Sequence, residues 1–170
     1  MPKFEIKPFT EQYRDQVFSL ILKIQNEEFG VPITVQDQPD LANISSTYQK
    51  NNGNFWVALQ EEEVIGTIAL NDIGDGKSAL KKMYVSKNYR GNVGVGKLLL
   101  DNLFDWCQKK NIQEIYLGTT AYFLAAQRFY EKNGFVEISR DKVPSQFPFT
   151  KYQTKFYLHC VIPDKLHVRL

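Results

Sequence analysis

The sequence predicts an α/β (α+β) fold, in which helices cover both faces of a mixed, mostly antiparallel sheet of about seven strands. Short apolar or alternating runs typical of strands recur along the chain, and stretches with helical apolar spacing separate several of them. One pair of strand-like runs is joined by a hairpin-like turn. No internal repeat, low-complexity tract or linker divides the 170 residues, so we expect one domain over residues 1–170.

The first expected elements are a strand and a long helix. Residues 4–7 alternate between apolar and polar side chains, which is typical of a strand. Thr10 is placed to cap a helix over residues 11–28. Counted from Tyr13, apolar side chains recur there at +4, +7, +8 and +11 and share one face of the helix. Gly30 and Pro32 end this helix, and the loop that follows is long enough to cover a substrate.

A shorter helix and an antiparallel hairpin come next. Asp40 is placed to cap a helix that ends near Lys50. Residues 55–59 and 64–70 are apolar runs, and the acidic turn between them predicts that the two strands pair antiparallel. A further strand is expected over residues 78–85.

The remaining elements alternate between helices and strands. A glycine-rich turn and an apolar helix precede a strand over residues 115–119, and a second helix begins near Ala125. A short strand over residues 136–138, a proline-broken loop over 142–150 and a last strand over 153–161 complete the order.

Composition and charge exclude several classes of protein. The net charge of +2 and the scattered lysines argue against nucleic acid as a partner. No apolar run approaches the ~20 residues of a membrane span, and the first residues lead into no signal-type segment, so we expect a cytoplasmic protein without a membrane partner. Cys107 and Cys160 lack metal-ligand spacing, which predicts no metal site and a buried, reduced Cys107. Monomer and homodimer both remain open.

The glycine-rich turn at residues 90–97 is typical of a phosphate site, because such turns aim backbone N–H groups and a helix N-terminus at an anion. A nucleotide-binding GxxxxGK motif fits from Gly91 to Lys97, but Leu98 stands where Ser or Thr holds Mg²⁺. The dinucleotide motif GxGxxG lacks its third glycine. A plain tight turn is the remaining alternative, although each glycine has a conformational entropy cost that needs a reason.

A third phosphate motif fits the turn better and extends beyond it. A strand ending Met83-Tyr84-Val85 is followed by Arg90 and by Gly94-Val95-Gly96, and the later segment places Ala126, Tyr130, Gly134 and Phe135 at fixed spacing. This stretch, residues 80–135, resembles the acetyl-CoA site of the GNAT superfamily of N-acetyltransferases. The order of the flanking elements also suits the whole GNAT fold.

The resemblance implies an enzyme that transfers an acetyl group from acetyl-CoA, its cosubstrate, to a primary amine by direct attack. The acceptor would be a small molecule or a peptide. The backbone of Met83 and Val85 would bind the pantetheine arm, and the N–H groups of residues 91–97 would bind the diphosphate. The side chains of Arg90 and Lys97 would add positive charge. The residues expected to bind the cosubstrate are Met83, Tyr84, Val85, Arg90, Gly91, Asn92, Val93, Gly94, Val95, Gly96, Lys97, Ala126, Tyr130 and Lys132.

The sequence departs from the family pattern at three places. Three residues, not two, separate Arg90 from Gly94. Phe123 stands where many members have an asparagine, and Ala79 lies near the position of a frequent glutamate base. These departures keep open an alternative function, an acyl-CoA-binding sensor with little or no turnover.

Tyr130 is the expected catalytic residue, because a phenol with a pKa near ~10 can donate a proton to the leaving thiolate of coenzyme A. A tyrosine that only packs in the core is the alternative reading of the same residue. The base that accepts the amine proton is left open among Glu27, Glu28, Asp72 and Glu114. The family position of the acceptor implies contacts from Glu28, Phe29, Ile33 and Phe147.

Overall fold

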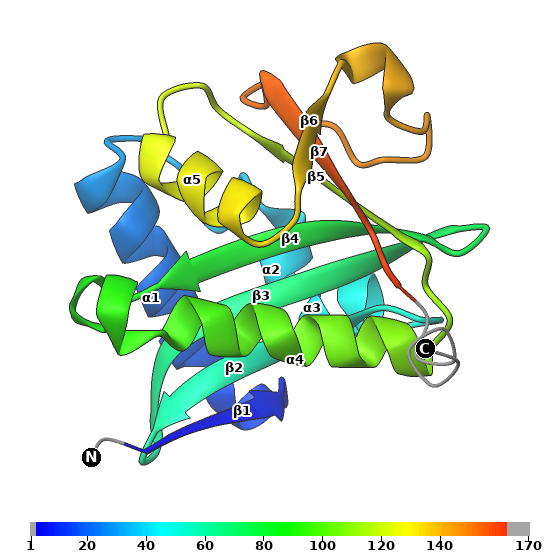
Figure 1. The fold of residues 1–170 in the computed structure, drawn as a ribbon. Helices are drawn as coiled ribbons and strands as arrows, with labels where there is room; N and C mark the ends of the chain where they lie inside the picture. The colour runs from blue at the N-terminus through cyan, green and yellow to red at the C-terminus, as the bar shows by residue number, and fades with distance from the viewer. Residues whose placement is uncertain (1–2, 163–170) are drawn as a thin grey trace. The chain divides into compact units, whose positions relative to one another are not determined.

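The computed structural model describes residues 3–162 and pairs seven strands in the order β1-β2-β3-β4-β5-β7-β6 (Figure 1). The β4–β5 pair is parallel, and the β1–β2, β2–β3, β5–β7 and β6–β7 pairs are antiparallel. The sheet is therefore mixed and open, which confirms the expected fold class. By their contacts the described residues form two compact units, 3–71 with 81–105 and 72–80 with 106–162. Each unit is described by itself.

The first unit holds most of the helices and the larger part of the sheet. In Figure 1, α1, α2 and α3 lie on one face of its strands and α4 lies on the other. Its elements are β1 (Phe4–Pro8), α1 (Arg14–Lys23), a π-helical turn (Ile24–Glu28), α2 (Pro39–Ala42), α3 (Ile44–Tyr48), β2 (Asn54–Gln60), and parts of β3 (Glu63–Gly74), β4 (Lys77–Val85) and α4 (Val95–Lys109).

Two packing arrangements hold the first unit together. On one face, buried Val17 and Ile21 of α1 join an apolar cluster with Phe55 and Val57 of β2. On the other face, Gly66 of β3 lets α4 approach closely, because a Cβ there would lie 3.0 Å from Leu99 Cδ1. Burial of such side chains supplies about 1.5–3 kcal/mol each.

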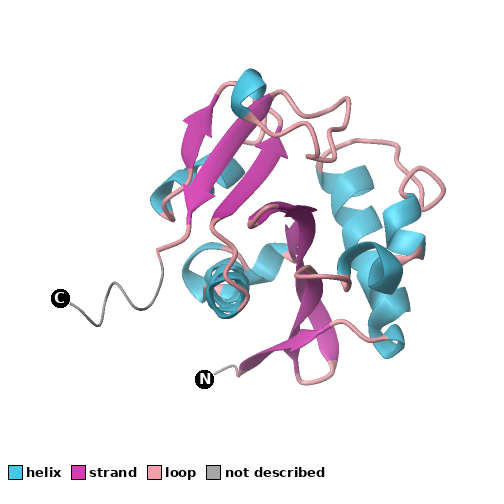
Figure 2. Cartoon of the chain, turned by 90° about the vertical axis from the view of Figure 1, so that its right-hand side faces the viewer, coloured by secondary structure: helices cyan, strands magenta, loops and turns pink. Residues whose placement is uncertain are grey.

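The second unit is built on β5 (Glu114–Thr119), β7 (Lys155–Cys160) and β6 (Val136–Ile138), with α5 (Leu124–Lys132). These three strands lie side by side (Figures 1 and 2). Tyr116, Phe147 and Phe156 belong to its buried core. Cys107 is buried and reduced as expected, and burial raises its pKa to about 12. Within residues 3–162, no helix is long and apolar enough to cross a bilayer.

Two expected helix caps are wrong. Thr10 makes no side-chain capping bond, because a 3₁₀ turn at Glu11–Tyr13 separates it from α1. Asp40 lies inside α2, which spans Pro39–Ala42, so it cannot cap the start of that helix. The Asp40 carboxylate instead accepts a hydrogen bond from Tyr48 and pairs with Lys82.

Candidate active site

The glycine-rich turn has a backbone shape that side chains would oppose. Gly91 and Gly94 have φ values of 66° and 84°, in the left-handed region. A Cβ at either position would meet no atom within 4 Å, so the backbone conformation, not packing, requires glycine. The left-handed backbone is thus the physical reason for glycine at both positions, and the surface of the turn is open there.

The turn leads directly into a helix N-terminus. The additional residue between Arg90 and Gly94 is absorbed by a 3₁₀ turn over Gly91–Val93, closed by a 3.0 Å bond from Gly94 N–H to the Gly91 carbonyl. The first N–H groups of α4, at Val95, Gly96 and Lys97, have no acceptor within the helix, and the helix dipole is positive there. This geometry suits an anion such as a phosphate.

The charged side chains of the turn have protein partners in this structure. Arg90 donates from Nε to the Val85 carbonyl at 2.7 Å, and its guanidinium lies 2.7 Å from a carboxylate oxygen of Glu28. Lys97 pairs with Asp101 one helical turn later, and both side chains are about half exposed, so this pair contributes little stability. Arg90 therefore joins the glycine-rich turn to the π-helical turn that follows α1.

Strand β4, which carries Met83, Tyr84 and Val85, contains a backbone irregularity. Lys82 has a φ of 51°, although it is neither glycine nor in a loop. Such a conformation costs about 1–3 kcal/mol and persists only where its surroundings hold it. The Thr67 hydroxyl does so by donating to the Lys82 carbonyl at 2.7 Å.

A polar network that the sequence analysis did not predict lies beside β4. Gln25 and Gln38 exchange two hydrogen bonds, at 3.0 and 2.8 Å, and Gln25 also donates to the Tyr84 hydroxyl at 2.9 Å. The Lys82 ammonium lies 2.7 Å from Gln38 Oε1 and 3.3 Å from Asp40 Oδ2. Asp40 in turn accepts from Tyr48 at 2.5 Å.

One part of this network had a detectable signal in the sequence. Gln25 lies four residues after Ile21 and eight after Val17, so helical spacing places a glutamine on the apolar stripe of α1. Gln25 and Gln38 are both buried, and a buried amide needs partners. The partners Lys82 and Asp40 come from distant segments, and no local pattern predicts their meeting.

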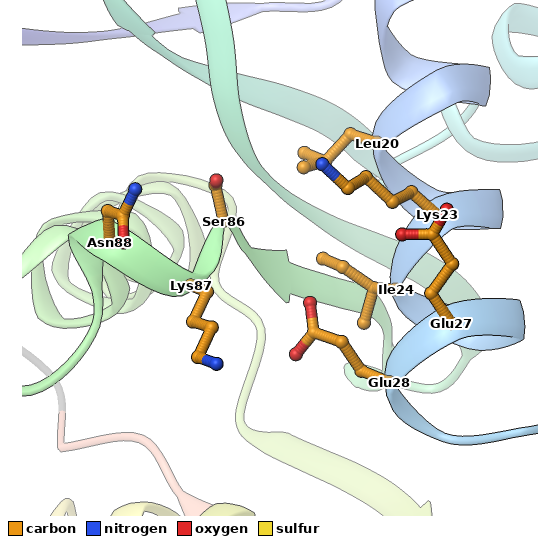
Figure 3. Close-up of a pocket in the computed structure, with 8 residues that line it drawn as sticks. All are labelled: Leu20, Lys23, Ile24, Glu27, Glu28, Ser86, Lys87 and Asn88. Carbon is orange, nitrogen blue, oxygen red and sulfur yellow. The ribbon is translucent and has the colours of Figure 1, made fainter.

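A pocket of about 330 Å³ lies between the end of α1 and the residues that follow β4. Figure 3 shows Glu28 extending from the π-helical turn toward the segment 86–88. Glu28 is the expected acceptor residue that lines this pocket, whereas Phe29 and Ile33 lie in the next loop. The lining residues are Leu20, Lys23, Ile24, Glu27, Glu28, Ser86, Lys87 and Asn88.

The four candidate bases occupy different surroundings. Glu27 and Glu28 line the pocket. Asp72 accepts the Gly74 N–H at 2.8 Å in a turn, and Glu114 accepts the Tyr116 hydroxyl at 2.8 Å. Of the four, Glu27 and Glu28 are thus the ones that lie in the pocket.

The second unit holds Tyr130, buried in an aromatic cluster. Its ring centroid lies 5.5 Å from that of Phe135 and 6.4 Å from that of Tyr157. Gly134, with a φ of 89°, ends α5, and the Phe135 N–H bonds back to the Tyr130 carbonyl at 3.0 Å. A Cβ at Gly134 would also lie 3.0 Å from the His159 ring. The spacing of tyrosine, glycine and phenylalanine is thus a helix-ending motif.

The other predicted residues of the second unit differ in exposure. Ala126 is half-buried and Lys132 is exposed, both on α5. Phe147 is only 3% exposed and packs against Phe149 and Phe156 at ring distances of 5.0 and 6.1 Å. The structure therefore gives Phe147 a packing role in the core of this unit.

In this protein a strand of the seven-stranded mixed sheet, β4, is followed by a glycine-rich turn and the N-terminus of α4. This arrangement is typical of acyltransferases with the GNAT fold. Residues 18–135 match the family model described as "Acetyltransferase (GNAT) family". The chain belongs to this family, which confirms the identification made from the sequence motifs.

Individual relatives agree with this assignment. An acetyltransferase of the GNAT family from Staphylococcus aureus has a TM-score of 0.89 and 41% identity, covering 94% of this chain and 100% of its own. An acetyltransferase from Streptococcus agalactiae has a TM-score of 0.87 and 32% identity, covering 92% and 98%. N-acetylaspartate synthetase from Xenopus tropicalis is 36% identical over 101 residues, which are 58% of this chain and 37% of the relative. The chain thus matches only about a third of the length of such curated relatives.

Proposed function

We propose that this protein transfers the acetyl group of acetyl-CoA to a primary amine of a small molecule or peptide. The observation that carries the proposal is the turn from Arg90 to Lys97, whose two left-handed glycines expose the N-terminus of α4. A diphosphate is the natural ligand of such a turn. Family membership supports the choice of acetyl-CoA as the donor.

The proposed reaction is direct attack of the amine nitrogen on the thioester carbon. A C–N bond forms, the C–S bond breaks, and the sulfur leaves as a thiolate that needs a proton. We assign that proton to the Tyr130 hydroxyl. Backbone N–H groups of Met83 and Val85 are proposed to bind the donor and to stabilise the negative charge on its carbonyl oxygen.

The proposed acceptor site is the pocket between α1 and the residues after β4. Two carboxylates in its lining, Glu27 and Glu28, favour a cationic amine over a neutral or anionic group. Either carboxylate could take the proton that the attacking amine loses. Phe29 and Ile33 are proposed to complete the site from the adjoining loop.

A thiol-release assay tests the proposal. The purified protein is incubated with acetyl-CoA and a panel of amino acids, polyamines, aminoglycosides and peptides, and free coenzyme A is measured. We expect release that depends on both donor and acceptor. Acetyl-CoA binding measured by calorimetry without release across the panel would favour the sensor. No binding at millimolar acetyl-CoA, with the protein verified as folded, would contradict both functions.

A further inference from the structure

The peptide group between Lys82 and Met83 has an orientation that a side chain fixes. The Thr67 hydroxyl donates to the Lys82 carbonyl at 2.7 Å. The peptide bonds of residues 3–162 are all trans, and in a planar trans peptide group the carbonyl and the N–H point in opposite directions. The N–H of this group belongs to Met83. It is therefore directed away from the Thr67 hydroxyl and from β3, the strand that carries Thr67.

Thr67 is well suited to hold this carbonyl. Its side chain is fully buried, and a hydroxyl that is shielded from water needs an acceptor within the protein. The Lys82 carbonyl is that acceptor. Because threonine is branched at Cβ, few side-chain rotamers are open to it, and its hydroxyl stays in one place. The hydrogen bond thus fixes the direction of the peptide group, not only its position.

Lys82 is also held at the far end of its side chain. Its ammonium lies 2.7 Å from Gln38 Oε1 and 3.3 Å from Asp40 Oδ2. With a φ of 51°, Lys82 has a strained backbone conformation that persists only where the surroundings impose it. The bond from Thr67 acts on its carbonyl, and the two polar contacts act on its ammonium. The irregularity in β4 is therefore fixed at both ends of one residue.

We propose that Thr67 is a positioning residue for acetyl transfer, because its hydroxyl sets the direction in which the Met83 N–H meets the thioester carbonyl oxygen. As the amine nitrogen bonds to the carbonyl carbon, the π electrons of the C=O bond move to the oxygen, and the N–H donates to the charge that develops there. A donor that is already aimed needs no reorganisation at that moment. This inference rests on the proposed function and identifies the residue that orients one of its backbone donors.

A kinetic test compares three variants. Thr67→Val keeps the shape of the side chain without its hydroxyl, and Thr67→Ser keeps the hydroxyl. Ser78→Ala is the matched control, because it removes another buried hydroxyl that donates to a backbone carbonyl, that of Glu114 at 3.0 Å. We expect kcat of Thr67→Val to fall by about 10- to 100-fold while KM for acetyl-CoA changes little, since the aimed N–H acts mainly on charge that develops in the transition state. Thr67→Ser and Ser78→Ala should retain the parental kcat.

A measurement on the Met83 N–H itself makes the test independent of turnover. Met1 and Met83 are the two methionines of the chain, so ¹⁵N-methionine labelling gives a simple spectrum, and a Met83→Leu variant assigns the Met83 signal. Acetyl-CoA carries the thioester carbonyl that coenzyme A lacks. We expect the Met83 amide proton to move further downfield with acetyl-CoA than with coenzyme A, because a new hydrogen bond deshields it. Thr67→Val should lose this difference, and Thr67→Ser should keep it.

Loss of kcat and of the Met83 shift in Thr67→Val, with both kept in Thr67→Ser, supports the inference. A Met83 signal that responds equally to acetyl-CoA and coenzyme A in the parent would overturn it, even if Thr67→Val does not fold. A Thr67→Val protein with the parental kcat, or a Thr67→Ser protein as slow as Thr67→Val, would also overturn it. Acetyl transfer by the parent would in those cases leave the proposed function standing, whereas a folded parent that binds no acetyl-CoA would contradict that function itself.

Discussion

The guanidinium of Arg90 lies 2.7 Å from the carboxylate of Glu28. The pair connects two proposed binding sites. Arg90 belongs to the turn that is proposed to bind the diphosphate, and Glu28 lines the pocket that is proposed to bind the acceptor. Its side chains are 39% and 27% exposed, so solvent screens it in part and a phosphate could compete for Arg90. Donor binding would then release Glu28 into the acceptor pocket.

This relationship predicts that Glu28→Gln strengthens binding of coenzyme A. The variant removes the competing carboxylate from Arg90, and we expect Kd to fall by about two- to five-fold, in line with a partly exposed ion pair. Isothermal titration calorimetry at low salt measures the Kd for coenzyme A. Glu27→Gln is the matched control, because Glu27 lines the same pocket without pairing with Arg90. If both variants bind coenzyme A like the parent, Arg90 does not contact the diphosphate.

We expect Tyr130→Phe to slow acetyl transfer by roughly ten-fold or more and to leave acetyl-CoA affinity nearly unchanged, because only the proton donor is lost. Single-turnover kinetics with rapid quench separates the chemical step from product release. Tyr157→Phe removes a hydroxyl from the same aromatic cluster, one that donates to Glu131 at 2.7 Å, and controls for packing. An unchanged single-turnover rate for Tyr130→Phe would refute the assigned role.

Gly94→Ala should lower the free energy of unfolding by about 1–3 kcal/mol and weaken coenzyme A binding, because φ is 84° there and a Cβ strains the turn. Urea denaturation and titration calorimetry report the two effects. Gly96→Ala is the control for the unfolding measurement alone: Gly96 lies in the first turn of α4, where alanine favours the helix. Equal stability of the Gly94→Ala variant and the parent would show that the turn relaxes without loss.

The lowered pKa of Lys81 predicts a pH dependence of stability. With a folded-state pKa of about 8 and an ordinary value near ~10.4, the unfolded chain binds more protons between these pH values. The free energy of unfolding therefore rises with pH from 8 to 10, by roughly 1–3 kcal/mol from this group. Lys81→Met should reduce that rise, as measured by urea unfolding at each pH. An identical slope in both proteins would mean that Lys81 titrates normally.

The single domain expected from the sequence remains a prediction. If residues 1–170 form one domain, thermal unfolding should be one cooperative transition, with the calorimetric enthalpy equal to the van 't Hoff enthalpy. Circular dichroism and the fluorescence of Trp56 and Trp106, which lie in different units, should give the same midpoint. Two separate midpoints would identify the two units as independent domains.

Local patterns predicted most of the fold because strands and helices carry their period in the sequence. The hairpin of β2 and β3 and the order from β4 to β7 follow from such patterns. The expected cap at Asp40 failed because a tertiary partner binds its carboxylate: Lys82 lies 42 positions away in sequence. At Thr10 a 3₁₀ turn precedes α1 instead. The same limit applies to the site. Gly91 and Gly94 were recognisable locally, whereas the pairing of Arg90 with Glu28 depends on folding.

The π-helical turn at Ile24–Glu28 has a consequence for engineering this protein. A π-helical turn accommodates one residue more than an α-helical one, and the surplus residue sets which side chains face β4. Deleting a single residue between positions 24 and 28 would rewind the segment as α-helix and change which of its side chains face β4. Acceptor preference could thus be altered by a one-codon deletion at a site where point substitutions only exchange functional groups.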